Sequence, residues 1–161
     1  MEPRMNAMEV APGAYQAMSS LEMYVRKSSR LEHSLIHLIK IRASQLNGCS
    51  YCIDMHTKDA RAAGETEQRI YALSAWEETP FFTDRERSAL AWTEAVTFIS
   101  QKQVNDALYE EVRKRFSEEE IVNLTLAIVT INGWNRLSIA FRAVPGEYQP
   151  GAYKKMETVK Q

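Results

Sequence analysis

Residues 38–57 read LIKIRASQLNGCSYCIDMHT and contain the clearest structural signal in the chain. Apolar residues recur at helical spacing up to Leu46. Asn47-Gly48 then has the character of a helix end, because glycine adopts positive φ without strain. A second helix is expected to begin near Cys49 and to run to Ala63. The stretch therefore predicts two helices joined by a tight turn, with both cysteines at the start of the second helix.

Helical periodicity also dominates the rest of the chain, and strand-like alternation is nearly absent. Thr83 with Glu86, and Ser117 with Glu120, have the spacing of a capping box, which marks the start of a helix. Helices are expected over residues 19–28, 32–46, 49–63, 67–76, 83–100, 105–115, 121–132 and 134–142. The sequence therefore predicts an all-α fold, in which apolar residues off the main stripe bury the helix 32–46 on more than one side.

Residues 130–134, TINGW, are similar to residues 45–49, QLNGC, and an apolar helix precedes both segments. By analogy with the first Asn-Gly pair, we expect Asn132-Gly133 to interrupt the helical pattern and to separate two helices. The length of 161 residues suits one domain with a sizeable core. The ends are rich in Pro, Gly and charge, so we expect an N-terminal arm over 1–17, a helical domain over 18–144 and a C-terminal tail over 145–161.

The overall composition excludes several classes of protein. A net charge of −1 provides no basic surface for nucleic acid. No apolar run is long enough for a membrane-spanning helix, and the N-terminus does not resemble a secretory signal. We therefore expect a cytoplasmic protein with no membrane and no nucleic-acid partner. In that compartment a close cysteine pair indicates redox chemistry or metal binding rather than a structural disulfide.

Cys49, Cys52 and His56 are spaced by three and four residues, which places all three on one face of a helix. Two sulfurs at this spacing can close into a disulfide with little rearrangement. The positive end of the helix favours a thiolate in its first turn and can lower a cysteine pKa to about 3.5–7.5. An imidazole one turn further on can accept and return a proton. This pattern predicts thiol redox chemistry, with no cofactor and no metal.

Two other interpretations follow from the same residues. If the helices on either side of Asn47-Gly48 run antiparallel, His37 comes level with His56, and both histidines with Cys49 and Cys52 could form a zinc site in a structural or regulatory module. Zinc sites do not usually take three ligands from one helix face, which counts against this alternative. Inert packing of the two cysteines is the other interpretation. Lys40 and Arg42 are expected to form salt bridges between helices.

The run from Leu38 to Thr57, with its CxxCxxxH core, closely resembles the central motif of the AhpD-like alkylhydroperoxidases in the carboxymuconolactone decarboxylase superfamily. Residues 83–97 and 131–136 also resemble the corresponding segments of that group. The resemblance as a whole covers residues 20–142. It implies a helical homo-oligomer, a trimer or a hexamer, that reduces organic hydroperoxides with a dithiol or a lipoylated protein as reductant. A decarboxylase or lactone-acting enzyme, as in other branches, would not call for a cysteine pair.

The resemblance implies that Cys52 attacks the peroxide and that Cys49 resolves the product, whereas the helix dipole alone favours Cys49 as the thiolate. Both orders are compatible with the sequence. Two positions depart from the usual pattern: His37 occupies the place of a glutamate, and Tyr51 that of a histidine between the cysteines. His37 can still relay a proton, as a base with a pKa near 6.5. Cys49, Cys52, His56 and His37 are therefore the predicted catalytic residues.

Overall fold

The computed structural model describes residues 1–101 and 103–151, and these ranges contain helices and connecting segments but no strands. The predicted all-α class is therefore confirmed. None of the described helices has the length and apolar character needed to span a membrane. The α-helices are α1 (Ala7–Val10), α2 (Pro12–Ser28), α3 (His33–Asn47), α4 (Ser50–Ala62), α5 (Glu67–Ala72), α6 (Asp84–Thr97), α7 (Asp106–Arg113) and α8 (Glu118–Phe141), and the 3₁₀ helix η1 (Leu73–Glu78) follows α5.

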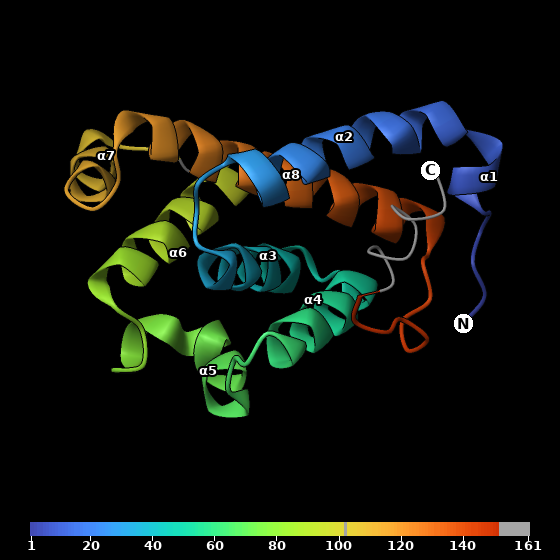
Figure 1. The fold of residues 1–161 in the computed structure, drawn as a ribbon, viewed down its shortest axis with the longest axis horizontal. Helices are drawn as coiled ribbons and strands as arrows, with labels where there is room; N and C mark the ends of the chain where they lie inside the picture. Colours follow the sequence, from blue (N-terminus) through green and yellow to red (C-terminus); the bar gives the residue numbers. More distant parts are fainter. Residues whose placement is uncertain (102, 152–161) are drawn as a thin grey trace.

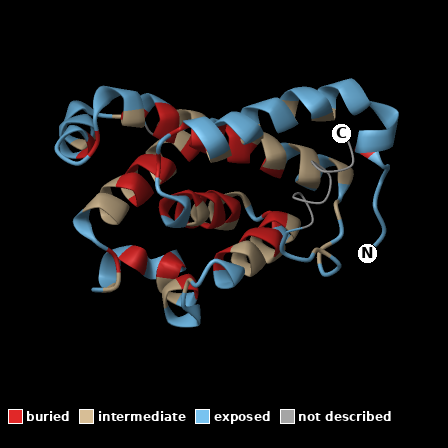
Figure 2. Ribbon diagram, in the orientation of Figure 1, coloured by how far each residue is buried: buried red, intermediate tan, exposed pale blue. Residues whose placement is uncertain are grey.

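Helix α3 lies at the centre of the fold, and α4, α6 and α8 pack around it (Figure 1). Leu35, Ile36 and Ile39 belong to a core cluster shared with α6, α7 and α8. Leu38 and Ile41 belong to a second cluster, which includes residues of α4, α5 and α6. Figure 2 shows α3 largely buried in the interior. The prediction that this helix is buried on more than one side is confirmed.

Both predicted capping boxes are formed. The side chain of Thr83 accepts the N–H of Glu86 at the start of α6, and Ser117 accepts that of Glu120 at the start of α8. In each pair the glutamate side chain accepts the backbone N–H of the capping residue in return. These reciprocal bonds satisfy N–H groups that have no partner within the helix, which explains why the two helices begin where the sequence predicts.

The predicted interruption at Asn132-Gly133 is wrong, because α8 continues through it as one helix of 24 residues. Gly48 has φ of 70°, whereas Gly133 lies in the helix interior and needs no positive φ. Its role is close approach: a Cβ at Gly133 would lie 2.8 Å from Cε of Met18. The second Asn-Gly pair therefore allows α2 to pack tightly against α8 instead of ending a helix.

Part of the segment expected as an arm over 1–17 is helical. It contains α1, and α2 begins at Pro12. Arg4 donates its backbone N–H to the carbonyl oxygen of Phe141 (3.0 Å) and its side chain to that of Ala140 (2.8 Å). The end of α8 therefore receives the partners that its last carbonyl groups need. Of the expected C-terminal tail, residues 152–161 lie outside the described residues.

Candidate active site

The turn between α3 and α4 fixes the position of Cys49. Gly48 adopts the left-handed conformation and donates its N–H to the carbonyl oxygen of Gln45 (3.2 Å). Cys49 donates its N–H to the carbonyl oxygen of Ser44 (3.0 Å) and then serves as the N-cap of α4. Its sulfur accepts the N–H of Cys52 at 3.3 Å. The sequence correctly placed this helix start, and the structure adds that Cys49 itself caps the helix.

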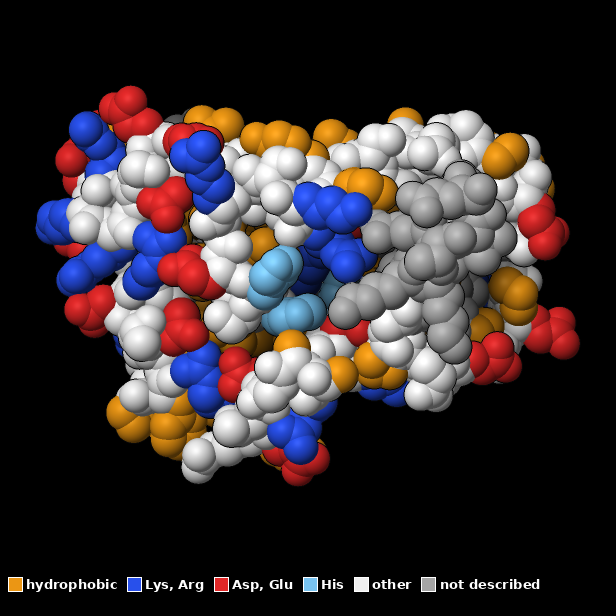
Figure 3. All heavy atoms as spheres, viewed as in Figure 1, with side chains coloured by type: hydrophobic (Ala, Val, Ile, Leu, Met, Phe, Trp, Pro, Cys, Tyr) orange, Lys and Arg blue, Asp and Glu red, His pale blue; other side chains and the backbone are white. Residues whose placement is uncertain are grey.

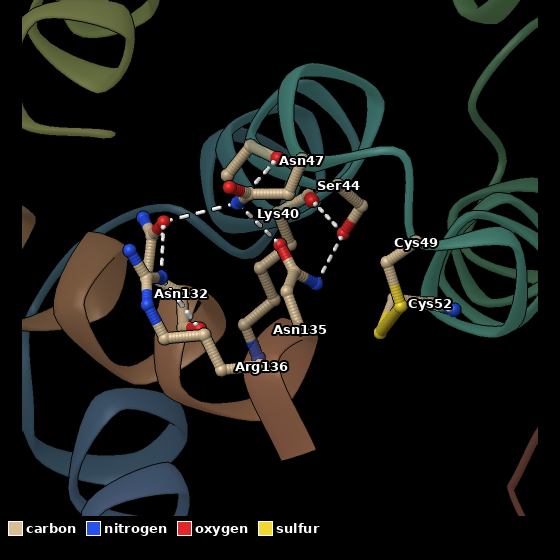
Figure 4. Close-up of a disulfide and its surroundings, with 9 residues drawn as sticks. Lys40, Ser44, Asn47, Cys49, Cys52, Asn132, Asn135 and Arg136 are labelled. Atoms are coloured by element: carbon tan, nitrogen blue, oxygen red, sulfur yellow. Dashed lines mark hydrogen bonds between the residues drawn. A yellow bond between two sulfur atoms is a disulfide. The ribbon is translucent and has the colours of Figure 1, made fainter. Parts of the chain in front are cut away.

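Cys49 and Cys52 form a disulfide at this helix start, with their Cα atoms 5.3 Å apart (Figure 4). That separation is within the usual range for a disulfide. Each cysteine is only 1% exposed. The predicted approach of the two sulfurs is therefore observed, and any reactant must reach a nearly buried pair.

His56 lies one turn after Cys52 on α4, is 6% exposed, and has no hydrogen-bond partner at Nε2. Burial lowers the pKa of His56 well below its usual 6.5, and the charges of Lys40 and His37 lower it further. His37, on α3, also has a buried nitrogen, Nδ1, without a partner. Its pKa is lowered by burial and then by Lys40, against an opposing effect of Asp59. The structure therefore brings the two predicted histidines within electrostatic reach, with both neutral forms favoured at pH 7.

The positive charge of Lys40 lies close enough to both histidines to affect their pKa values. Figure 3 shows histidine side chains beside Lys or Arg side chains near the middle of one face of the molecule. Lys40 is 3% exposed and pairs with Glu22 of α2, and Arg42 pairs with Glu94 of α6 at 2.7 Å. The interhelical salt bridges expected for Lys40 and Arg42 are confirmed. The sequence did not predict Glu22 as the partner of Lys40.

The lowered pKa of His56 makes stability depend on pH. Below about pH 6.5 the imidazole of His56 is protonated in the unfolded chain but stays neutral in the folded protein. Its contribution to the free energy of unfolding is therefore fully present above pH 6.5 and is lost as the pH falls below that value. The slope per histidine is at most about 1.4 kcal/mol per pH unit. We expect guanidinium unfolding to show lower stability at pH 5.5 than at pH 7.5, and His56→Gln to flatten this dependence.

The matched control is His33→Gln, which removes an exposed imidazole from the start of α3. This variant should keep the wild-type difference between pH 5.5 and pH 7.5. Equal stability of the wild-type protein at the two pH values would contradict the assignment of a neutral, buried His56.

A partly buried network of side-chain hydrogen bonds lies near the disulfide (Figure 4). Asn47, at the end of α3, donates to Oδ1 of Asn132 (3.0 Å) and to Oδ1 of Asn135 (2.8 Å), both on α8. Nδ2 of Asn135 donates to the hydroxyl of Ser44 (3.0 Å), and Arg136 donates to Oδ1 of Asn132 (3.0 Å). The predicted catalytic residues did not include these side chains, although residues 131–136 belong to a segment that resembles the family. The similarity between residues 45–49 and 130–134 was the available signal, since the two asparagines of that repeat contact each other.

The zinc alternative requires two free thiolates and both histidines around one ion. In the structure the sulfurs are bonded to each other. In the described part of the chain, no three His, Cys, Asp or Glu side chains are placed to share a metal ion. The arrangement of Cys49, Cys52, His56 and His37 therefore does not match a zinc site.

Comparison with known proteins identifies a family to which the chain is similar. Residues 12–95 match the carboxymuconolactone decarboxylase family. The uncharacterized protein YdfG of Bacillus subtilis (strain 168) is 49% identical over 140 residues, which cover 87% of this chain and 95% of YdfG.

Solved structures show the same relationship. A protein of unknown function from Agrobacterium tumefaciens, described as an antioxidant defence protein of the AhpD type, is 46% identical, with a TM-score of 0.88 over 91% of this chain and 100% of that chain. The debrominase Bmp8 is 20% identical, with a TM-score of 0.74 over 87% of this chain and 75% of that chain, and this likeness concerns the fold alone. With its fold, its cysteine pair and these relatives, the chain belongs to the carboxymuconolactone decarboxylase family, as an AhpD-like member.

Proposed function

We propose that this protein is a thiol-dependent peroxidase that reduces organic hydroperoxides through Cys49 and Cys52, in antioxidant defence. The carrying observation is the disulfide at the start of α4, one turn before a buried His56 whose neutral form is favoured. A disulfide is the state that a two-cysteine peroxidase reaches after each reaction with peroxide. Membership of the AhpD-like group supports this activity, and because a fold alone does not fix a reaction, chemistry must test it.

In the proposed cycle His56 accepts the thiol proton of Cys52, and the resulting thiolate attacks the O–O bond of the hydroperoxide. The bond breaks, Cys52 becomes a sulfenic acid, and the leaving alkoxide takes the proton from His56 and departs as an alcohol. The thiolate of Cys49 then displaces hydroxide from the sulfenic acid, and the hydroxide takes a proton and leaves as water. An external dithiol restores both thiols by exchange and is itself oxidised to a disulfide.

We assign His37 to the proton path in place of the glutamate that AhpD-like proteins often carry. Its buried Nδ1 has no hydrogen-bond partner, and its charge affects the pKa of His56. A neutral imidazole can exchange protons between His56 and solvent from one cycle to the next without repelling a thiolate.

The burial of the pair bears on the reductant. Because each cysteine is 1% exposed, a small dithiol or the flexible arm of a lipoylated protein suits this site better than a rigid protein surface. We place the activity in the cytoplasm, where such thiols stay reduced.

The proposed homo-oligomer, a trimer or a hexamer, is supported by apolar side chains that α8 leaves exposed, Val122 at 67% and Val129 at 51%. Sedimentation velocity tests it.

The function is tested by single-turnover stoichiometry. The protein is reduced, freed of reductant, and mixed with one equivalent of cumene hydroperoxide. We expect about two thiols to disappear per peroxide consumed, with the disulfide located between Cys49 and Cys52 by peptide mass, because the pair supplies both electrons. Continuous turnover should then follow addition of a dithiol. Free thiols that persist with unreacted peroxide would contradict the proposal.

A further inference from the structure

The side chain of Asn135 is completely buried and joins α8 to the last turn of α3. Its Nδ2 donates to the hydroxyl of Ser44 (3.0 Å), and its Oδ1 accepts a hydrogen bond from Asn47 (2.8 Å). Figure 4 shows the amide between these two residues, with the disulfide nearby. Both ends of the amide are therefore used, and they hold two positions that lie three residues apart on α3.

Both of these positions support the backbone of Cys49. The carbonyl oxygen of Ser44 accepts the N–H of Cys49 (3.0 Å). Asn47 is the last residue of α3, and Gly48 connects it to Cys49. Asn135 is thus linked to Cys49 through Ser44 by two consecutive hydrogen bonds, and through Asn47 by the chain itself.

The position of Cys49 matters because its sulfur caps α4. Cys49 has φ −83° and ψ 93°, and in this extended conformation its sulfur accepts the N–H of Cys52 at 3.3 Å. After reduction, a thiolate at this place would receive the same N–H and the positive end of the helix dipole. A rotation of the Cys49 backbone would remove both stabilising interactions.

We propose that Asn135 is a positioning residue that holds Cys49 at the N-cap of α4 and so maintains its sulfur as a thiolate once the disulfide is reduced. This inference rests on the proposed role of the cysteine pair in thiol chemistry.

The partners of Asn135 have other hydrogen bonds, which makes a specific effect on the thiol measurable. The hydroxyl of Ser44 also donates to the carbonyl oxygen of Lys40 (2.7 Å), and Asn47 also donates to that of Ala43 (2.9 Å). Removal of the amide therefore leaves neither partner without a hydrogen bond. The fold should persist, while the end of α3 loses two of the hydrogen bonds that join it to α8 and keeps the one from Asn47 to Asn132.

The test compares Asn135→Leu with Asn123→Leu, in a Cys52→Ser background where only Cys49 titrates. Asn123 is a matched control, because it is a buried asparagine on the same helix that accepts from Tyr24 (3.1 Å) and donates to the carbonyl oxygen of Ser29 (3.0 Å). Asn123 lies nearer the start of α8, about 18 Å from Asn135 along the helix axis. The rate of iodoacetamide alkylation is measured against pH for each variant.

We expect Asn135→Leu to raise the apparent pKa of Cys49 by about one unit, which lowers its alkylation rate at pH 6 by up to about tenfold. Asn123→Leu should leave the pKa unchanged, and Ser44→Ala, which removes one of the two bonds, should give a smaller rise. Should Asn135→Leu fail to fold, the pKa of Cys49 in Ser44→Ala tests the inference instead: a rise supports it, and an unchanged value overturns it. An unchanged pKa in Asn135→Leu, or an equal rise in Asn123→Leu, overturns the inference. Because alkylation involves no peroxide, a shifted pKa in these variants, together with no peroxidase turnover by the wild-type protein, would refute the proposed function and leave this inference standing.

Discussion

Replacement of either Cys49 or Cys52 by serine is expected to reduce peroxidase turnover with a dithiol to the uncatalysed background. Each cycle needs one sulfur to take the oxygen and a second to release it as water, so neither cysteine can complete the cycle alone. Because the two residues act as a unit, each single variant should lose about as much activity as the double variant. Turnover of cumene hydroperoxide measures this loss.

The two variants should differ in a single reaction with peroxide. In Cys49→Ser, Cys52 keeps His56 one turn away and should form a sulfenic acid that dimedone traps. In Cys52→Ser, the capping Cys49 should be alkylated readily but should react slowly with peroxide. Ser50→Ala is the control, since Ser50 is exposed in the same turn and should leave activity intact. The reverse pattern of dimedone labelling would assign the attack to Cys49.

The helices that follow from local chemistry could be predicted from the sequence. The starts of α6 and α8 are set by capping boxes, and the end of α3 by a glycine in the left-handed conformation. Gly133 could not be interpreted in this way. Its dipeptide is identical to Asn47-Gly48, but the close approach of Met18 gives the second glycine a packing role. The same Asn-Gly dipeptide thus ends a helix at one position and lies inside a helix at the other. The packing of α2 against α8, which is not visible in the local sequence, determines the second case.

In the candidate site, too, the features set within one helix could be predicted from the sequence, and the contacts between helices could not. The spacing of Cys49, Cys52 and His56 follows from one helix, whereas Glu22 comes from α2 and carries no local signal. Asn135 comes from α8, in the segment 131–136 that resembles the family, but its bonds to Ser44 and Asn47 do not follow from the sequence. One pattern was visible in advance: His33, His37, Lys40, Ser44 and Asn47 alternate by four and three residues along α3. Such a polar stripe on a mostly apolar, buried helix indicates polar partners on its neighbours, without naming them.

The buried pair of Lys40 and Glu22 gives the second large expected effect. The side chain of Lys40 is 4% exposed and that of Glu22 is 22% exposed. Glu22→Gln leaves an ammonium group buried without a counter-charge, and partial access of water reduces this penalty to about 2–3 kcal/mol of unfolding free energy. Lys40→Met should cost less, because the remaining carboxylate can be partly hydrated. Guanidinium unfolding at pH 7.5 measures both variants.

The double variant Glu22→Gln with Lys40→Met separates a charge effect from a packing effect. If the unpaired ammonium causes the loss, removal of Lys40 should restore most of the stability that Glu22→Gln removes, giving a favourable coupling in the double-mutant cycle. Additive losses would show that Glu22 contributes through its packing alone.

Lys40→Met should also change the site without touching a cysteine. The charge of Lys40 lowers the pKa of both His56 and His37, so its removal should raise both values, as measured by NMR titration of the ring protons. Burial is the larger cause for each histidine, so both pKa values should stay below 6.5. The pH range in which His56 can accept a thiol proton should then begin at a higher pH than in the wild-type protein. If histidine titrations did not move, Lys40 would serve only to hold α2 against α3.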